Sequence, residues 1–132
     1  MATATESTLK AKTVSLGLTV NDLQQSIKFF ESLGFAVEDR WEEQSKLLGV
    51  MMRAGDASIG LNQDDWKKGR DRQKGVGMRL FIGTKQDIDQ IASHARTAGV
   101  KLDSEPHDTE WKTRAFEVTE PTGFKITISS EK

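Results

Sequence analysis

The sequence predicts an α+β fold made of two βαβββ modules, and three observations lead to this prediction. Residues 14–20, VSLGLTV, alternate large apolar with small side chains, which is typical of a strand with one buried face. Residues 21–34, NDLQQSIKFFESLG, place apolar side chains at helical spacing. The same pattern returns in the second half of the chain, which indicates an internal repeat. An offset of 62 residues aligns Val14, Leu16, Leu18 and Val20 with Val76, Met78, Leu80 and Ile82, and an offset of 67 aligns Ile59 and Leu61 with Ile126 and Ile128.

The first module is predicted over residues 12–62, after a disordered N-terminal tail at 1–11. Its first strand covers 12–20, and Asn21 or Asp22 can cap the helix that follows, because either side-chain oxygen accepts a backbone hydrogen bond. Gly34 ends that helix. Three further strands are expected at 35–41, 47–53 and 57–62.

The second module is predicted over residues 76–131, after a charged linker without apolar period at 63–75. The two modules form one domain over 12–131. Because the offset between copies grows from 62 to 67, we expect the second helix to be the longer one. Its elements are expected as a strand at 76–82, a helix at 85–99, and strands at 100–102, 112–118 and 124–129, with a turn at 120–123.

The composition of the chain excludes several classes of function. The chain of 132 residues has a net charge of −1, so it lacks the basic surface of a nucleic-acid-binding protein. No apolar run approaches membrane-spanning length, and the absence of cysteine excludes disulfides, thiolate catalysis and cysteine metal sites. We therefore expect a cytoplasmic protein with neither nucleic-acid nor membrane partners.

Three segments carry a resemblance to a known family. They are VNDLQQSIKFFESLGF (20–35), AGV (98–100) and EPTGFKITI (120–128). In this order and spacing they resemble the vicinal oxygen chelate superfamily, which includes glyoxalase I, extradiol dioxygenases, and fosfomycin- and bleomycin-resistance proteins. The resemblance extends over roughly 12–130. It implies curved, mostly antiparallel sheets that enclose a cleft for a small molecule, helices on the outer faces, and a homodimer whose modules pair within or between chains.

The resemblance also implies which side chains face the cleft. They are the alternate residues of four strands, on the side away from the helices: Ser15, Gly17 and Thr19; Ser58, Gly60 and Asn62; Gly77, Arg79 and Phe81; and Lys125, Thr127 and Ser129.

The enzymes of this superfamily hold a divalent metal with one His, Glu or Gln from each of these strands. The matching positions here are Ser15, Gly60, Gly77 and Thr127. None offers a strong donor, and a catalytic metal site needs about three. Of the two histidines, His94 falls in a helix and His107 in a polar loop. The sequence thus predicts no metal and no other cofactor.

Aromatic and cationic side chains are the candidates for binding a ligand in the cleft. The three tryptophans, Trp41, Trp66 and Trp111, fall at strand ends or in loops. We expect them to contact a ligand; the alternative is that they cover the edges of the core or a dimer interface. Arg79 has either an anionic ligand or an acid such as Glu117 as its partner, and Arg114 and Lys125 add positive charge. The complete predicted site is Ser15, Gly17, Trp41, Asn62, Trp66, Arg79, Phe81, Trp111, Arg114 and Thr127.

The function predicted from these residues is metal-independent binding of a small molecule, such as sequestration of an aromatic or toxic compound, with no catalytic residue. The first alternative is a lyase- or isomerase-type enzyme of the glyoxalase family. Its site is either metal-free or relocated to His107, Asp108 and Glu110. The second alternative is a protein-interaction module that kept the fold and lost the pocket.

Overall fold

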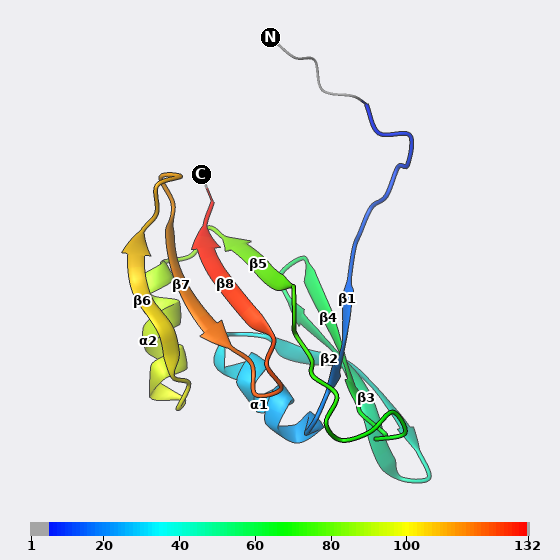
Figure 1. Ribbon diagram of the computed structural model, residues 1–132. Helices are drawn as coiled ribbons and strands as arrows, with labels where there is room; N and C mark the ends of the chain where they lie inside the picture. The colour runs from blue at the N-terminus through cyan, green and yellow to red at the C-terminus, as the bar shows by residue number, and fades with distance from the viewer. Residues whose placement is uncertain (1–5, 132) are drawn as a thin grey trace.

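The computed structural model describes residues 6–131, and the first βαβββ module lies within residues 16–63 (Figure 1). The strand order in its sheet is β1-β4-β3-β2, with β1 parallel to β4 and the other pairs antiparallel. Its elements are β1 (Leu16–Val20), α1 (Leu23–Ser32), β2 (Ala36–Glu43), β3 (Lys46–Ala54) and β4 (Ala57–Gln63).

The second module repeats this arrangement. Its strand order is β5-β8-β7-β6, again with one parallel pair, β5 with β8, and two antiparallel pairs. The two sheets are separate and open, so the predicted α+β fold with two modules is confirmed, and neither sheet is closed. The elements are β5 (Arg79–Thr84), α2 (Ile88–Thr97), β6 (Leu102–Asp108), β7 (Arg114–Thr119) and β8 (Lys125–Ser130).

The two helices begin and end as their local sequence dictates. The Asp22 carboxylate accepts a hydrogen bond from the Gln25 backbone N–H at 3.2 Å, and Asp87 caps α2 in the same way. Gly34 and Gly99 follow the helix ends with φ of 106° and 99°, a backbone conformation that side chains with a Cβ rarely adopt.

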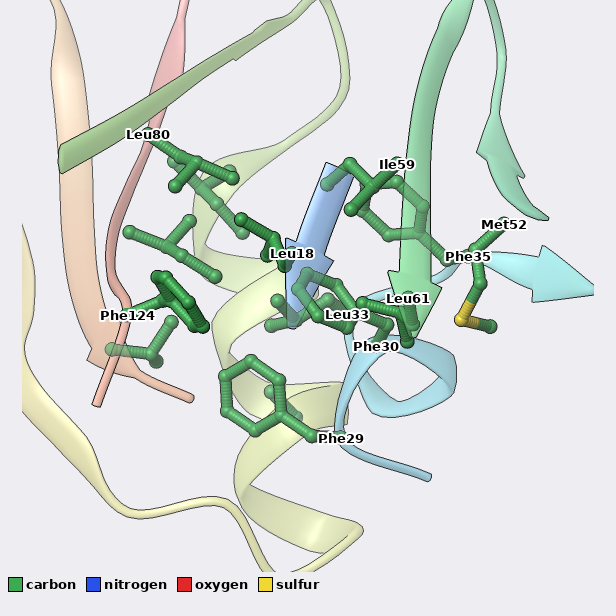
Figure 2. Packing of buried hydrophobic residues seen from close by; sticks show 14 of the residues in the cluster. Leu18, Phe29, Phe30, Leu33, Phe35, Met52, Ile59, Leu61, Leu80 and Phe124 are labelled. Atoms are coloured by element: carbon green, nitrogen blue, oxygen red, sulfur yellow. The ribbon is translucent and has the colours of Figure 1, made fainter. Parts of the chain in front are cut away.

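A single hydrophobic core joins the two modules. It extends from Met52 and Phe35 in the first module to Leu80 and Phe124 in the second (Figure 2). Leu18 of β1 belongs to the same cluster and is 2% exposed. The helices therefore cover one face of each sheet, and the core lies between helix and sheet.

A buried polar contact also joins the modules. Glu120, in the turn between β7 and β8, is 1% exposed and accepts a hydrogen bond from the Ser26 hydroxyl of α1. Next to it, the Asn21 backbone N–H donates to the Thr122 hydroxyl at 3.1 Å. The turn of the second module is thus fixed on the helix of the first.

Several predicted boundaries were wrong. Both helices have ten residues, so the extra residues of the second module do not lengthen its helix. Three of the five extra residues fall before it, because α2 begins 65 residues after α1 whereas the leading strands are offset by 62, and the other two fall between the helix and the last strand. The second predicted strand of the second module, 100–102, is instead Leu102–Asp108, because Pro106 and its polar neighbours concealed an edge strand.

Both leading strands start later than predicted. Residues 12–15 and 76–78 belong to no strand, and Figure 1 shows the chain before β1 extending away from the sheets. Val14 is 89% exposed and Val76 is 73% exposed, although the alternation placed both in the core. Neither has a helix over it. The tail predicted at 1–11 lies partly outside the described residues, and 6–11 form no helix or strand.

Candidate ligand-binding site

Each sheet has one face away from its helix, which we call its open face. In the first module the buried residues of β3 and β4, such as Val50 and Leu61, face α1. The alternate residues therefore form the open face, and most of them are small or apolar. The face carries Gly17, Thr19, Trp41, Gly49, Met51, Gly60 and Asn62, with Asp39, Arg53 and Ser58 beside them.

Trp41 lies flat on this face because its neighbour in the sheet has no side chain. Trp41 of β2 pairs with Gly49 of β3, and a Cβ added to Gly49 would lie 2.3 Å from Trp41 Cε2. The indole occupies that space and remains 38% exposed. Trp41 and Asn62 are thus on the same face, since Asn62 pairs with Gly49 from the other side.

The open face of the second module is charged. The Arg79 guanidinium of β5 forms an ion pair with Glu117 Oε2 of β7 at 3.0 Å. Thr127 of β8 lies between them, accepting from Arg79 at 3.0 Å and donating to Glu117 at 3.3 Å. Ser104 of β6 donates to the other carboxylate oxygen at 3.2 Å. All four strands therefore contribute to one hydrogen-bonded network, which confirms that Glu117 is a partner of Arg79.

Phe81 is the aromatic side chain of this face. It follows Arg79 by two residues in β5 and is the sheet neighbour of Thr127. Its side chain is 77% exposed, which is unusual for a phenylalanine in a strand. The second module therefore presents an exposed aromatic ring beside a satisfied polar network.

A cavity of about 550 Å³ adjoins this face where the linker enters β5. Lys125 of β8 is the sheet neighbour of Arg79 and reaches toward Thr119, with its ammonium 3.4 Å from the hydroxyl. Gly77 has a φ of 75° and nothing within 4 Å of where a Cβ would be. The lining residues are Lys74, Gly75, Val76, Gly77, Met78, Arg79, Gly123 and Lys125.

Trp66 lies in the linker between two cations. Its ring centroid is 4.7 Å from Arg70 Cζ and 4.8 Å from Lys74 Nζ. Asp64 accepts a hydrogen bond from the Trp66 backbone N–H at 2.8 Å and pairs with Lys74 at 2.7 Å. The hydrogen bond from Lys74 lowers the pKa of the Asp64 carboxyl. Trp66 therefore fixes the linker, and through Lys74 it contacts the wall of the cavity.

Besides Trp66 of the linker, three predicted site residues lie away from the open faces. Arg114 is on the helix side of β7 and binds Asp89 of α2 at 2.7 and 2.9 Å, which lowers the pKa of the Asp89 carboxyl. Trp111 is 63% exposed in the turn between β6 and β7. A third, Ser15, precedes β1 and is exposed. The structure thus brings Arg79, Phe81 and Thr127 together, and separately Gly17, Trp41 and Asn62.

Comparison with known proteins now identifies the family. The model of the glyoxalase/bleomycin resistance protein/dioxygenase superfamily matches residues 12–128. The chain belongs to this superfamily.

Solved structures share the fold of the chain. A superfamily member from Sphaerobacter thermophilus has a TM-score of 0.70 at 22% identity, covering 92% of this chain and 98% of that one. A virulence protein from Salmonella typhimurium has a TM-score of 0.68 at 22% identity, covering 94% and 99%. TioX from Micromonospora has a TM-score of 0.68 at 13% identity, covering 92% and 97%. No curated protein matches the chain. At these identities the structures support the fold alone.

The residues present do not fit the metal of the superfamily's enzymes. The four motif positions are Ser15, Gly60, Gly77 and Thr127, and none offers an imidazole or carboxylate. The Thr127 hydroxyl is already held by Arg79. Within residues 6–131 no three His, Cys, Asp or Glu side chains gather in an arrangement that could hold a metal ion.

The alternative metal site at the β6–β7 hairpin has no better geometry. The His107 ring Nδ1 contacts the backbone carbonyl of Glu105 at 2.8 Å. Asp108, which precedes the turn, is paired with Arg114 at 3.0 Å. Its carboxylate therefore already has a cationic partner, so these side chains do not form a cation site.

Sequence reasoning missed two members of the polar network. Ser104 was not considered because the strand that carries it, β6, was predicted to end at residue 102. Glu117 was considered only as a partner for Arg79, although the alternation Phe116-Glu117-Val118 places it on the open face. The alternation could have found Glu117 but not Ser104, because a register shift between Leu102 and Ser104 brings Ser104 opposite Glu117.

Proposed function

We propose that the chain binds a small organic molecule on the open faces of its two modules, without a metal. The observation that supports this most directly is the replacement of the metal position on β8 by a protein-only network, in which Arg79, Glu117 and Thr127 satisfy one another. The exposed rings of Phe81 and Trp41 supply the apolar contacts that such ligands need. The ligand-binding domain is then residues 12–131.

The same proposal includes a homodimer in the cytoplasm. Val14 and Leu16, before and at the start of β1, are both exposed. Two exposed apolar side chains at the leading end of an edge strand are favourable for association with a second copy. Within residues 6–131, neither helix has the length and apolarity needed to cross a membrane.

Metal content and ligand binding test the proposal together. The purified protein is incubated with zinc, nickel, manganese or iron(II), freed of excess metal and analysed for bound metal. We expect less than about a tenth of an equivalent of each. A panel of aromatic compounds is then titrated while tryptophan emission is recorded, with Trp41→Phe to assign the change. Stoichiometric metal, or no saturable response, would contradict the proposal.

A metal-free enzyme of the glyoxalase family is the second candidate, and Glu117 is the observation that favours it. Its carboxylate is half-buried on the open face, where it would meet a ligand. A positioned carboxylate is a suitable general base. Mass spectrometry of each bound compound before and after incubation with the protein distinguishes a binding protein from a metal-free enzyme. Conversion that Glu117→Gln abolishes, with binding retained, would identify an enzyme.

A further inference from the structure

The cavity beside β5 has an uneven distribution of charge. Three of its lining residues are cations, and two of them have acidic partners: Lys74 pairs with Asp64 at 2.7 Å, and Arg79 pairs with Glu117 at 3.0 Å. Lys125 forms no ion pair with any residue of the described range 6–131. Its ammonium has only the Thr119 hydroxyl, at 3.4 Å. That hydroxyl donates to the Asp103 carboxylate, so Lys125 has no direct acidic partner and is connected to an acid only through Thr119.

The backbone at the same cavity offers further donors. Gly75, Val76 and Gly77 form the chain segment that leads into β5, and two of them have positive φ, 78° and 75°. None of the three backbone N–H groups donates to a partner within residues 6–131. Backbone N–H groups in such a segment, next to the Lys125 ammonium, are suitable donors to an oxyanion.

Apolar side chains border this cationic corner. Val76 is 73% exposed and Met78 is 38% exposed in the cavity wall, and Phe81 is 77% exposed on the adjoining open face. A ligand that contacts all three and also reaches Lys125 has an apolar body and an acidic group at one end. A purely ionic ligand would leave these apolar side chains exposed, and a neutral one would leave the charge of Lys125 unpaired.

We propose that this cavity binds the carboxylate, sulfonate or phosphate group of an otherwise apolar small molecule, and that Lys125 supplies the charge that selects it. The inference rests on the proposed function, and it assigns the ligand class and the selecting residue. Arg79 has a structural role instead. Its ion pair with Glu117 holds the guanidinium in the wall of the cavity. The cavity is open to water, so the effect of Lys125 is moderate and depends on salt.

Two dyes with the same aromatic body test this assignment. One is 8-anilinonaphthalene-1-sulfonate, and the other is the neutral N-phenyl-1-naphthylamine, and the emission of both rises in apolar sites. Each is titrated into the wild-type chain, into Lys125→Met, and into Lys85→Met. Methionine keeps the length of the side chain and removes its charge. Lys85 is an exposed lysine beyond the opposite end of β5, so Lys85→Met is the matched control.

We expect the wild-type chain to bind the sulfonate more tightly than the neutral dye. Lys125→Met should weaken sulfonate binding about 3- to 10-fold, leave the neutral dye unchanged, and reduce the dependence of sulfonate binding on salt. Lys85→Met should behave as the wild type. If both dyes bind and Lys125→Met affects neither, the assignment is wrong and the proposed function stands. If neither dye nor any compound of the aromatic panel binds, both are wrong.

Discussion

The two modules share a scaffold and differ in what they present on it. Each has a ten-residue helix over a four-stranded sheet of the same strand order. On the open faces, the first module has Gly17 and Gly60 side by side, whereas at the corresponding place the second has Phe81 beside Thr127, within a charged network. The helix-facing residues of both modules are buried and apolar.

This difference shows which constraints the fold imposes. Residues that face a helix must exclude water and fill space, so they remain apolar in both copies. Residues on an open face contribute little to the core, so their chemistry can differ between copies without loss of the fold. The function of this chain is therefore to be sought where the modules differ.

A second difference concerns how the modules are joined. The β7–β8 turn of the second module places Glu120 against Ser26 of α1, where both are buried. The corresponding position of the first module, near the end of β3, is Arg53, whose partner is Glu38 on the surface. The junction is therefore asymmetric, with the second module fixed to the helix of the first.

The largest expected effect comes from removing the buried carboxylate of this junction. Glu120→Ala leaves the Ser26 hydroxyl and the Thr122 backbone N–H without their acceptor, so we expect a loss of about 3 kcal/mol in the free energy of unfolding. Arg53→Ala, the corresponding change in the first module, breaks only a half-exposed ion pair and should cost less than about 1 kcal/mol. Urea unfolding measures both. Equal losses would show that the junction is not asymmetric.

The leading end of β1 gives the next test, because its apolar side chains are exposed and line no cavity of the second module. Val14→Asp and Leu16→Asp each place a charge on an exposed apolar position of the proposed dimer. We expect each to raise the dimer dissociation constant at least about 10-fold. Leu9→Asp, on a leucine that is 78% exposed outside the strands, is the control. Sedimentation velocity measures association, and a wild-type chain that stays monomeric would refute the dimer.

The linker supplies a pH-dependent test. Lys74 lowers the pKa of Asp64 in the folded chain, whereas the unfolded carboxyl titrates near about pH 4. The charged Asp64 therefore stabilises the fold above about pH 4, and this stabilisation is lost as the pH falls through the lowered folded-state pKa. We expect Asp64→Asn to be less stable than the wild type at pH 7, with a difference that shrinks in acid. Urea unfolding at pH 7, 4 and 3 measures it.

Asp65→Asn is the matched control for this experiment. Asp65 precedes Trp66, as Asp64 does, but its carboxylate is 64% exposed and 4.0 Å from Lys67. Removing it should change stability little at any pH. A difference between the wild type and Asp64→Asn that stays constant from pH 7 to 3 would contradict the role given to Asp64.

The sequence predicted more of the fold than of the site. Alternation identified the strands and the face of Arg79, Phe81 and Thr127 because strand geometry is local. Alternation applied to Arg114 would also have placed it on the helix face, with Phe116 and Val118, but its ion pair with Asp89 depends on a helix 25 residues away in the sequence. Alternation could not place Trp66 between Arg70 and Lys74 either, because a linker without period has no predictable face.

The smallest expected effect on stability distinguishes Gly60 and Gly77, the two glycines at positions that correspond to metal ligands in the superfamily's enzymes. Gly77 has a φ of 75°, so Gly77→Ala should cost about 1 kcal/mol through backbone strain alone. Gly60 lies in a regular strand, where a Cβ would meet its nearest atom, the Leu16 carbonyl oxygen, at an ordinary 3.6 Å. We therefore expect Gly60→Ala to change the free energy of unfolding by less than about 0.5 kcal/mol.

Neither the backbone nor the packing thus requires a glycine at position 60. If Gly60 keeps the surface clear for a ligand, then Gly60→Leu should weaken binding of the aromatic compounds of the panel while the unfolding midpoint stays within a few degrees, about the shift that 1 kcal/mol produces. Met51, whose Cε would lie 3.7 Å from the new Cβ, is the neighbour that must move. Full affinity in Gly60→Leu would place the ligand on the second module alone, and the two open faces would then differ in function as well as in chemistry.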